Sequence, residues 1–332
     1  MTRAPQQVRI GYFGKLPSRG DFIKSAEQVA LLNLLDDWLA QVMNALTGEP
    51  RWKCHYDALR PLDFAFVGTR SHRAIAGRLC ASSDQSQRRF PFLTVSAVDI
   101  DDPAGFVPRS PLVLGDLWRQ LAAFSGQVLA RAEPALALQS LAAATVMVAP
   151  DGATHDAGFA AFLDGHTVGS LDAMLAASGF AGPLRQLLPA LGMLLRPVRE
   201  AAAAPPEKSL VLPLARASRE RLLLASLWLH LIVPFVAVLD VELALFLTDA
   251  GSGPALVVGF NGADRHALRA IIDPGAGIDH QIGFTEMAWV DEQLADDHGA
   301  HRFAACLAQP QLSLRAACAL FERIFACTQE PP

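Results

Sequence analysis

Three strand-like runs lie close together in the first third of the chain. Leu62, Phe64 and Phe66 alternate with smaller or polar residues, and two further apolar runs follow at residues 74–80 and 92–98. Strands so near one another in sequence can pair antiparallel through short connections, whereas parallel pairing needs a long crossover. We therefore expect an antiparallel sheet in this part of the chain.

Helical periodicity flanks the predicted sheet. Apolar side chains repeat on one face over residues 25–46, and a second helix is expected over residues 110–132. Together these elements predict an α+β fold: a mainly antiparallel sheet covered by helices on one face, with a second, mixed α/β region further along the chain.

The pattern also predicts how the chain is divided. We expect an N-terminal α+β domain at residues 1–135, an irregular, linker-rich insertion at residues 136–216 that contains the A-A-A-A-P-P run, and a C-terminal region at residues 217–332 that packs on the first. Within the last region we expect helices over residues 219–232, 266–272 and 313–327, and strands over residues 236–247 and 255–260 joined by a D-A-G-S-G-P hairpin turn.

Composition excludes several classes of protein. Hydrophobic residues make up 52% of the chain and charged residues 18%, enough for a sizeable buried core. Lys and Arg number 28 against 33 Asp and Glu, with no strongly basic stretch, so a nucleic-acid partner is not expected. The five cysteines are scattered without a C-x-x-C pair, which is typical of free thiols in a reducing compartment. With no secretory signal at its start, the chain is expected to be cytoplasmic.

One apolar stretch, at residues 222–239, approaches the length that spans a bilayer. His230 and Pro234 interrupt it, and Asp240 and Glu242 follow at once. Because no cluster of Lys or Arg flanks its C-terminal side, we expect no stable membrane insertion but a buried helix followed by a strand.

No pattern of catalytic residues stands out. A phosphate-binding P-loop needs a Ser or Thr after its Gly-Lys pair and a glycine five residues before it, but Leu16 and Arg9 occupy these positions. There is no G-x-S-x-G nucleophile motif, and the acidic and histidine residues between Asp291 and His301 are better explained as a solvated helix end than as a metal site. We therefore expect that the protein is not an enzyme and that it binds no cofactor and no metal.

The most distinctive segment is G-Y-F-G-K-L-P-S-R-G-D-F at residues 11–22. Gly14, Pro17 and Gly20 suit a tight turn between a strand and a helix, and Asp21 could cap that helix. A direct partner-binding role is equally open at this point, because the chemistry of Lys15 and Arg19 exceeds what a turn requires. As an alternative function, Lys15, Arg19 and Arg88 could form an anion site in a small-molecule or nucleotide-binding enzyme.

This segment resembles the TagF (ImpM-like) family of type VI secretion-associated proteins, which opens with G-x-x-G-K-L-P-x-x-G-D-F/Y. Asp36, Trp38 and Leu39 match a following D-x-W-L helix, and Ser82, Asp84, Arg88, Phe90 and Pro91 match a later loop. In that loop Ala81 replaces a proline and Gln87 a glycine, which predicts a different loop shape. The tryptophan-rich strand of the family is replaced by L-A-L-F-L-T at residues 243–248.

The resemblance implies a cytoplasmic, non-enzymatic repressor that acts after translation. The resemblance also implies binding to the forkhead-associated scaffold protein of the secretion system. Such binding would limit assembly of the secretion machine. The residues carried over as motif or partner-binding positions are Gly14, Lys15, Leu16, Pro17, Ser18, Arg19, Gly20, Asp21, Phe22, Asp84, Arg88 and Phe90.

Overall fold

A computed structural model describes residues 4–200, 206–250 and 253–326. Its strands are β1 (Gln6–Arg9), β2 (Gly11–Gly14), β3 (Ile23–Lys24), β4 (Leu62–Gly68), β5 (Arg73–Cys80), β6 (Phe92–Asp99), β7 (Thr145–Val148), β8 (Ser209–Pro213), β9 (Glu242–Ala250), β10 (Gly253–Gly259) and β11 (Gln281–Gly283). Its helices are α1 (Val29–Leu46), α2 (Trp52–Asp57), α3 (Pro103–Leu129), α4 (Ala135–Ala143), η1 (Gly152–His155), α5 (Asp156–Gly165), α6 (Val168–Ala177), α7 (Leu184–Glu200), α8 (Ser218–Val236), α9 (Arg265–Ile272), α10 (Pro274–His280), α11 (Ala288–Asp296), α12 (His298–Leu307), α13 (Leu314–Phe321) and η2 (Glu322–Ala326).

One large sheet joins both ends of the chain. Its nine strands follow the order β11-β8-β10-β9-β4-β5-β6-β2-β3, while β1 and β7 form a separate pair. All neighbours in the large sheet are antiparallel except β11 and β8, which are parallel. Residues 63–68 of β4 pair with residues 242–247 of β9, and this pairing links the N-terminal strands to the C-terminal ones. The predicted α+β class, with a mainly antiparallel sheet, is confirmed.

Helices cover both faces of this sheet, and the expectation of a single covered face is wrong. Phe64 and Phe66 of β4 pack against Trp38 of α1, at ring-centroid distances of 5.7 and 5.1 Å. Residues of β4 that point the other way belong to the core shared with α3 and α8. The reason is that the central strands are apolar on both sides, so that either face left open would expose a large apolar surface.

Two predicted helices begin at other residues than expected. The first starts at Val29 rather than near residue 25, because the Ser25 amide donates to the Tyr12 carbonyl (3.0 Å) and is held beside β2. The second starts at Pro103 rather than at residue 110. Asp102 caps it by accepting from the Gly105 amide (3.1 Å), and a proline in the first turn is compatible with a helix start.

The apolar stretch at residues 222–239 belongs mostly to α8, and the strand expected from residue 236 is wrong in its first part. The helix continues past Pro234 to Val236, with the Ala237 amide donating to the Val233 carbonyl (2.9 Å), and β9 begins only at Glu242. Phe235 and Val236 are fully buried, and this packing outweighs the helix-breaking tendency of proline. Within the described residues, no helix is long and apolar enough to cross a membrane.

The segment at residues 136–216, expected to be irregular, is largely helical: it carries most of α4 and all of α5, α6 and α7, besides β7 and β8. Of its A-A-A-A-P-P run, residues 201–205 lie outside the described residues, as do residues 251–252 of the predicted hairpin turn. The expected C-terminal helix consists of α13 and a π-helical turn, η2, while residue 327 is again outside the described part. The division into three regions stays a prediction.

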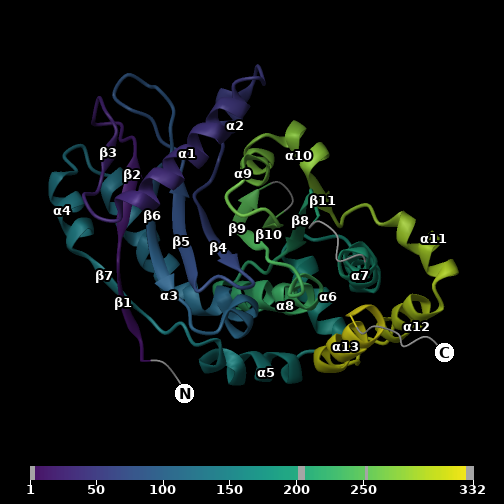
Figure 1. Ribbon diagram of the computed structural model, residues 1–332. Coiled ribbons are helices and arrows are strands. Elements are labelled where there is room, and N and C mark those ends of the chain that lie inside the picture. The colour runs from purple at the N-terminus through teal and green to yellow at the C-terminus, as the bar shows by residue number, and fades with distance from the viewer. Residues whose placement is uncertain (1–3, 201–205, 251–252, 327–332) are drawn as a thin grey trace.

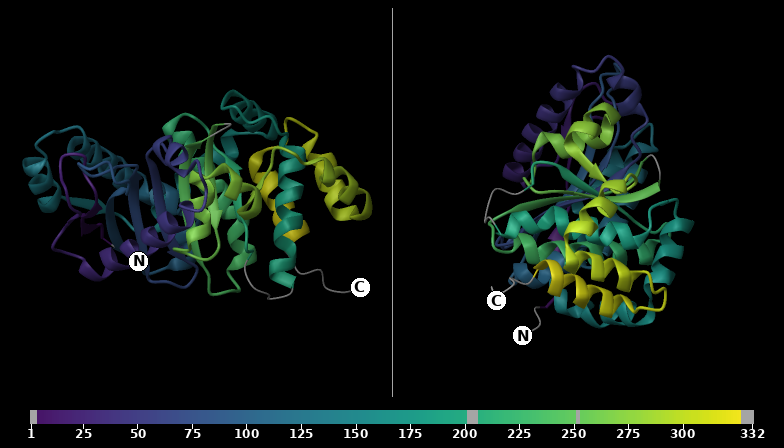
Figure 2. Two further views of the ribbon diagram at one scale, coloured as in Figure 1. Left: turned by 90° about the horizontal axis from the view of Figure 1, so that it is seen from above. Right: turned by 90° about the vertical axis from the view of Figure 1, so that its right-hand side faces the viewer.

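The first and last elements of the chain lie at opposite ends of the molecule. The N-terminal strands lie at one end, β8–β10 and α8 in the middle, and α11–α13 at the other end (Figures 1 and 2). The segment at residues 11–22 therefore lies at the end of the molecule opposite α11–α13.

Candidate functional site: the Gly11–Phe22 segment

Strand geometry explains the second glycine of the segment. Gly14 ends β2, has a φ of +131° and is paired with Phe92 of β6. A Cβ placed there would lie 2.0 Å from the Pro91 carbonyl oxygen, a distance that no side chain tolerates. Only glycine allows β2 to approach the Pro91–Phe92 backbone in this conformation.

Lys15 does not face solvent. It is 6% exposed, and its Nζ donates to Oδ2 of Asp84 at 2.9 Å. The Asp84 side chain is fully buried, and its Oδ2 also accepts from Nε of Arg88 at 2.6 Å. The two segments that the sequence singled out separately, residues 14–22 and 84–90, thus meet at one buried carboxylate.

The second oxygen of Asp84 is satisfied as well. Oδ1 accepts from the backbone amides of Ser86 and Arg88, each at 2.9 Å. Burial by itself would raise the pKa of Asp84, but the hydrogen bonds from Lys15 and Arg88 outweigh it and hold this pKa well below the usual range. Asp84 is therefore an anchor that is ionised at neutral pH.

Further hydrogen bonds fix the turn onto this anchor. Nη2 of Arg88 donates to the Gly20 carbonyl (2.8 Å), and the Gln85 amide donates to the Arg19 carbonyl (2.8 Å). On the inner side, Oγ of Ser82 donates to the Lys15 carbonyl (2.8 Å). The turn between β2 and β3 is therefore held at both ends by the loop at residues 82–88.

Gln87 stands where the family carries a glycine, and it adopts a left-handed backbone with a φ of +62°. Its amide donates to the Asp84 carbonyl (2.9 Å) and closes the loop around the carboxylate. Glycine adopts this conformation without strain, whereas glutamine does not.

Three phenylalanines form the outer wall of the site. Phe22 stacks on Phe13 with ring centroids 5.5 Å apart, and both meet the edge of Phe90 at 4.8 and 5.6 Å. Nζ of Lys15 lies 4.9 Å from the centre of the Phe22 ring. Phe13 and Phe90 are buried, but Phe22 is 48% exposed, which is unusual for so large an apolar side chain.

The remaining motif residues divide by exposure. Leu16 is buried, whereas Pro17, Arg19, Gly20, Asp21 and Arg88 are exposed and Ser18 is intermediate. Asp21 does not cap the following helix, because α1 begins after Gln28, which makes no side-chain cap. The prediction that Asp21 caps this helix is wrong. Below, the term motif surface means the exposed residues Arg19, Asp21 and Phe22.

A hollow of about 430 Å³ borders the turn at Pro17. Its lining includes Pro17 of the turn and Gln87 of the loop, together with the ion pair between Arg89 and Asp57, whose two hydrogen bonds measure 2.7 and 2.6 Å. Sequence reasoning missed it, because Asp57 and Leu129, also in its lining, come from parts of the chain that no motif connects.

The other sequence candidates serve local structure. Asp297 caps α12 through the Ala300 amide (2.9 Å) and pairs with Arg196 (2.6 Å), and Asp291 accepts from Gln186 (2.9 Å). His230 is largely buried in α8, and this burial lowers its pKa to about 4, so its ring is neutral at pH 7. In the described part of the chain, no group of three or more His, Cys, Asp or Glu residues could hold a metal ion.

Comparison with known proteins places the site in a family. The family model of the TagF N-terminal domain, described as type VI secretion system-associated, matches residues 11–145. Among solved structures, the chain is similar to PA0076 from Pseudomonas aeruginosa PAO1, with 18% sequence identity, 80% of this chain and 94% of that chain covered, and a TM-score of 0.44. The comparison with curated proteins gave no match. Residues 11–145, which contain the whole Lys15–Asp84–Arg88 site, thus form a TagF N-terminal domain, and the chain carries this type VI secretion system-associated domain.

Proposed function

We propose that this chain is a cytoplasmic, non-enzymatic repressor of the type VI secretion machine. It acts after translation by binding the forkhead-associated scaffold protein of the system, and it thereby limits assembly of the machine. The family of residues 11–145 supports the association with this secretion system, and the geometry of the motif supports a binding role.

The observation that carries the proposal is the rigid presentation of the motif surface. Arg19, Asp21 and Phe22 are exposed, yet the backbone on which they stand is tied to the buried Asp84 anchor. A partner meeting such a surface does not have to order a loop, so little binding free energy is lost to conformational entropy. Exposed aromatic and arginine side chains are also the residues that most often dominate protein interfaces.

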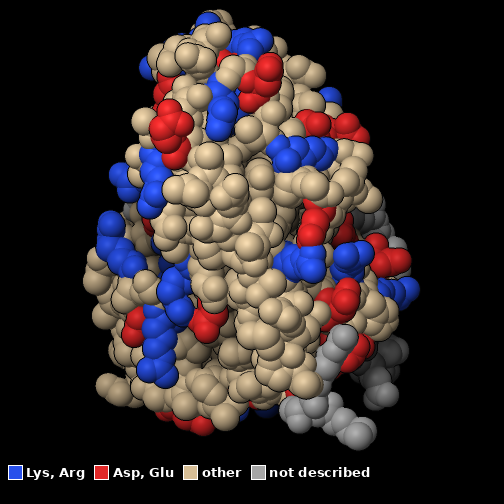
Figure 3. Space-filling model, turned by 90° about the vertical axis from the view of Figure 1, so that its left-hand side faces the viewer, with Lys and Arg blue, Asp and Glu red and all other residues tan. Residues whose placement is uncertain are grey.

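The end of the molecule that carries the motif offers room for a partner. In the view of Figure 3, positively and negatively charged side chains lie mainly toward the margins. Uncharged residues fill much of the middle. Phe22, Leu136 and Met147 are exposed large apolar residues at 48%, 70% and 57%, and they adjoin or belong to β3, α4 and β7, which lie together at this end in Figure 1. Interfaces between proteins combine such an apolar centre with a polar rim.

The geometry gives less support to an anion site at the Gly14–Gly20 turn. Lys15 and Arg88 both bind Asp84, so two of the three cations that such a site would use already share a carboxylate partner. Only Arg19 of that set has no ion pair among the described residues. A single exposed arginine is a weak basis for binding a nucleotide or a sugar phosphate.

Surface variants of the purified protein test the proposal directly. Binding to the purified forkhead-associated scaffold of the same secretion system is measured by isothermal titration for wild type, Arg19→Ala and Phe22→Ser. We expect about tenfold or weaker binding for each variant, since both remove hot-spot types of side chain. Arg302→Ala on α12 is the matched control, because Arg302 is exposed at the opposite end of the molecule.

Lys15→Met separates folding from binding. This change leaves buried Asp84 without one of its two cationic partners, so we expect the Tm to fall by roughly 5–10 °C. Arg19→Ala should keep the wild-type Tm, and Phe22→Ser, which loses the contacts of its half-exposed ring with Phe13 and Phe90, should lower the Tm less than Lys15→Met does. In cells lacking the gene, the two surface variants should then fail to restore repression of secretion and of competitor killing. Wild-type affinity for the scaffold in both surface variants would contradict the proposed binding surface.

A further inference from the structure

A second pocket lies in the middle of the molecule, apart from the motif. It has a volume of about 580 Å³, within the range of small-molecule sites. Its wall comes from α2 and the residues after it, the start of α8, the end of β9 and the beginning of β10, and the junction of α9 and α10. None of the residues that line it belongs to the Lys15–Asp84–Arg88 site.

One end of this pocket is cationic. Arg60, Arg216 and Arg221 line it together with a single carboxylate, Asp249. Arg221 and Asp249 form an ion pair at 2.8 Å, and Arg221 also donates to the Thr248 carbonyl (3.1 Å). Three positive charges against one negative charge leave an excess of two.

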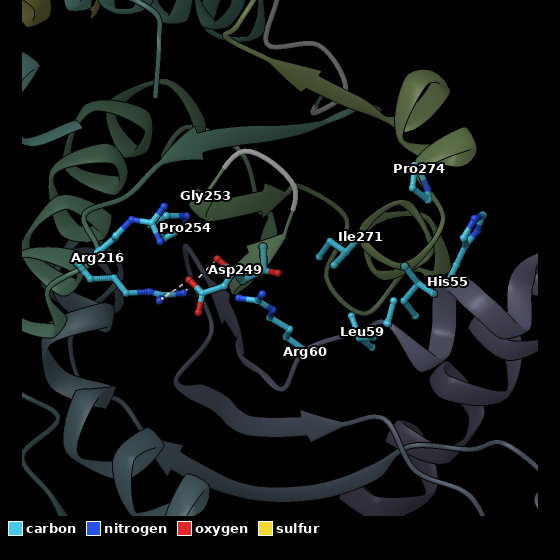
Figure 4. A pocket seen from close by; sticks show the side chains of 13 residues that line it. His55, Leu59, Arg60, Arg216, Asp249, Gly253, Pro254, Ile271 and Pro274 are labelled. Carbon is cyan, nitrogen blue, oxygen red and sulfur yellow. Dashed lines mark hydrogen bonds and ion pairs between the residues drawn. The ribbon is translucent and has the colours of Figure 1, made fainter. Parts of the chain in front are cut away.

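Arg60 and Arg216 supply that excess. Both are exposed, and within the described residues neither guanidinium forms an ion pair. The backbone of Arg216 is held in place, since its amide donates to Oγ of Ser178 at 3.2 Å. Figure 4 shows the side chains of Arg60 and Arg216 extending toward the Asp249 end of the pocket from opposite walls.

The other end of the pocket is mainly apolar. Leu59, Ile271 and Pro274 line it, and Figure 4 shows them grouped with His55 away from Arg216. Nδ1 of His55 lies 3.6 Å from Oδ1 of Asp273. This Nδ1 has no hydrogen-bond partner among the described residues. A flat or aliphatic group could therefore lie against this wall while an anionic group meets the arginines.

We propose that this pocket binds an organic phosphate monoester with an aromatic or apolar substituent. The dianionic phosphate matches the two unpaired guanidinium groups in charge, and each guanidinium can give two parallel hydrogen bonds to phosphate oxygens. The substituent packs on Leu59, Ile271 and Pro274. Arg221, already bound to Asp249, shapes the wall and offsets the one opposing charge.

Isothermal titration with phenyl phosphate tests the proposal. The comparison compounds are inorganic phosphate, which lacks the apolar part, and benzoate, which carries a single charge. We expect saturable binding of phenyl phosphate and binding of each comparison compound that is about tenfold weaker or more. Equal or tighter binding of inorganic phosphate or of benzoate would overturn the proposed ligand class, and so would an absence of heat with phenyl phosphate at millimolar concentration.

Variants assign the binding to this pocket. Arg60→Gln and Arg216→Gln should each weaken phenyl phosphate binding about tenfold or more, and the double variant should abolish it. Arg302→Gln changes the same charge far from the pocket and should bind like wild type. Because both pocket arginines are exposed, the Tm of these variants should stay unchanged. Unaltered phenyl phosphate binding in the double variant would contradict the assignment of the binding to this pocket. It would not affect the repressor proposal, since the two sites share no residue.

Discussion

Lys15 and Arg19 stand four residues apart in the motif, and the fold gives them different tasks. Lys15 is turned inward onto Asp84, whereas Arg19 is exposed on the turn that this contact stabilises. The sequence indicated both as residues with more chemistry than a turn needs, but it could not separate them. Burial decides the matter, and burial depends on the loop at residues 82–88, which lies far away in sequence.

Asp84 makes stability depend on pH. Because its pKa is lowered in the folded protein, its contribution is fully present above its unfolded pKa of about 4 and is lost as the pH falls further. At pH 7 we expect the wild type to have a higher free energy of unfolding, measured with urea, than the Asp84→Asn variant. This difference should shrink between about pH 4 and pH 2. A difference that stays constant over this range would contradict the ionised anchor.

Gln87 offers a stabilising substitution. Its left-handed backbone is strained for a residue with a Cβ, so we expect Gln87→Gly to raise the free energy of unfolding by about 0.5–1 kcal/mol. Gln85→Gly is the control, since Gln85 is exposed in the same loop without a positive φ, and glycine there should lower stability. Both values come from urea unfolding at pH 7. Destabilisation by Gln87→Gly would show that the side chain matters more than the backbone.

At the scale of elements, short-range patterns were reliable and long-range packing was not. Strands β4, β5 and β6 and helix α9 lie within a residue or two of their predicted positions, because alternation and helical period are local properties. The strand expected from residue 236 failed where Pro234 lies inside α8. A short apolar run suits a buried helix and a buried strand equally, and only its tertiary neighbours, such as Phe321 packed at 5.9 Å on Phe235, decide between them.

Trp38 is the main contact between α1 and the sheet. Its ring meets Phe64, Phe66 and Phe246, and its Nε1 donates to the Asp264 carbonyl (2.8 Å). We expect Trp38→Ala to lower the free energy of unfolding by about 3–5 kcal/mol. Leu34→Ala, on the same helix but 51% exposed, should change it by less than about 0.5 kcal/mol. Similar losses for both, measured by urea unfolding, would mean that α1 is held by its propensity and not by this cluster.

At the scale of the whole molecule, the central observation is the pairing of β4 with β9. The sequence predicted strands in both halves but gave no sign that they join one sheet, because strand pairing across so long a separation leaves no local pattern. The same limit hid the phosphate pocket, whose arginines at residues 60, 216 and 221 come together only after this sheet has formed.

A fragment ending after β7 tests how far the first part is independent. Residues 1–150 contain the matched TagF N-terminal domain but lack β9, so the edge of β4 and the aromatic residues beside Phe246 would be exposed. We expect this fragment to aggregate or to elute as an oligomer in size-exclusion chromatography, in contrast to the full chain. A monomeric fragment with cooperative thermal unfolding would support the predicted N-terminal domain as a separate folding unit.

The β4–β9 pairing also has a consequence for the chain as it leaves the ribosome. Residues 69–241 separate the two strands. At a synthesis rate of about 5–20 residues per second, roughly 10–35 s pass between the emergence of β4 and that of its neighbour. During this time the apolar edge of the nascent sheet has no partner within its own chain. We therefore expect the yield of folded protein to depend on the supply of chaperones.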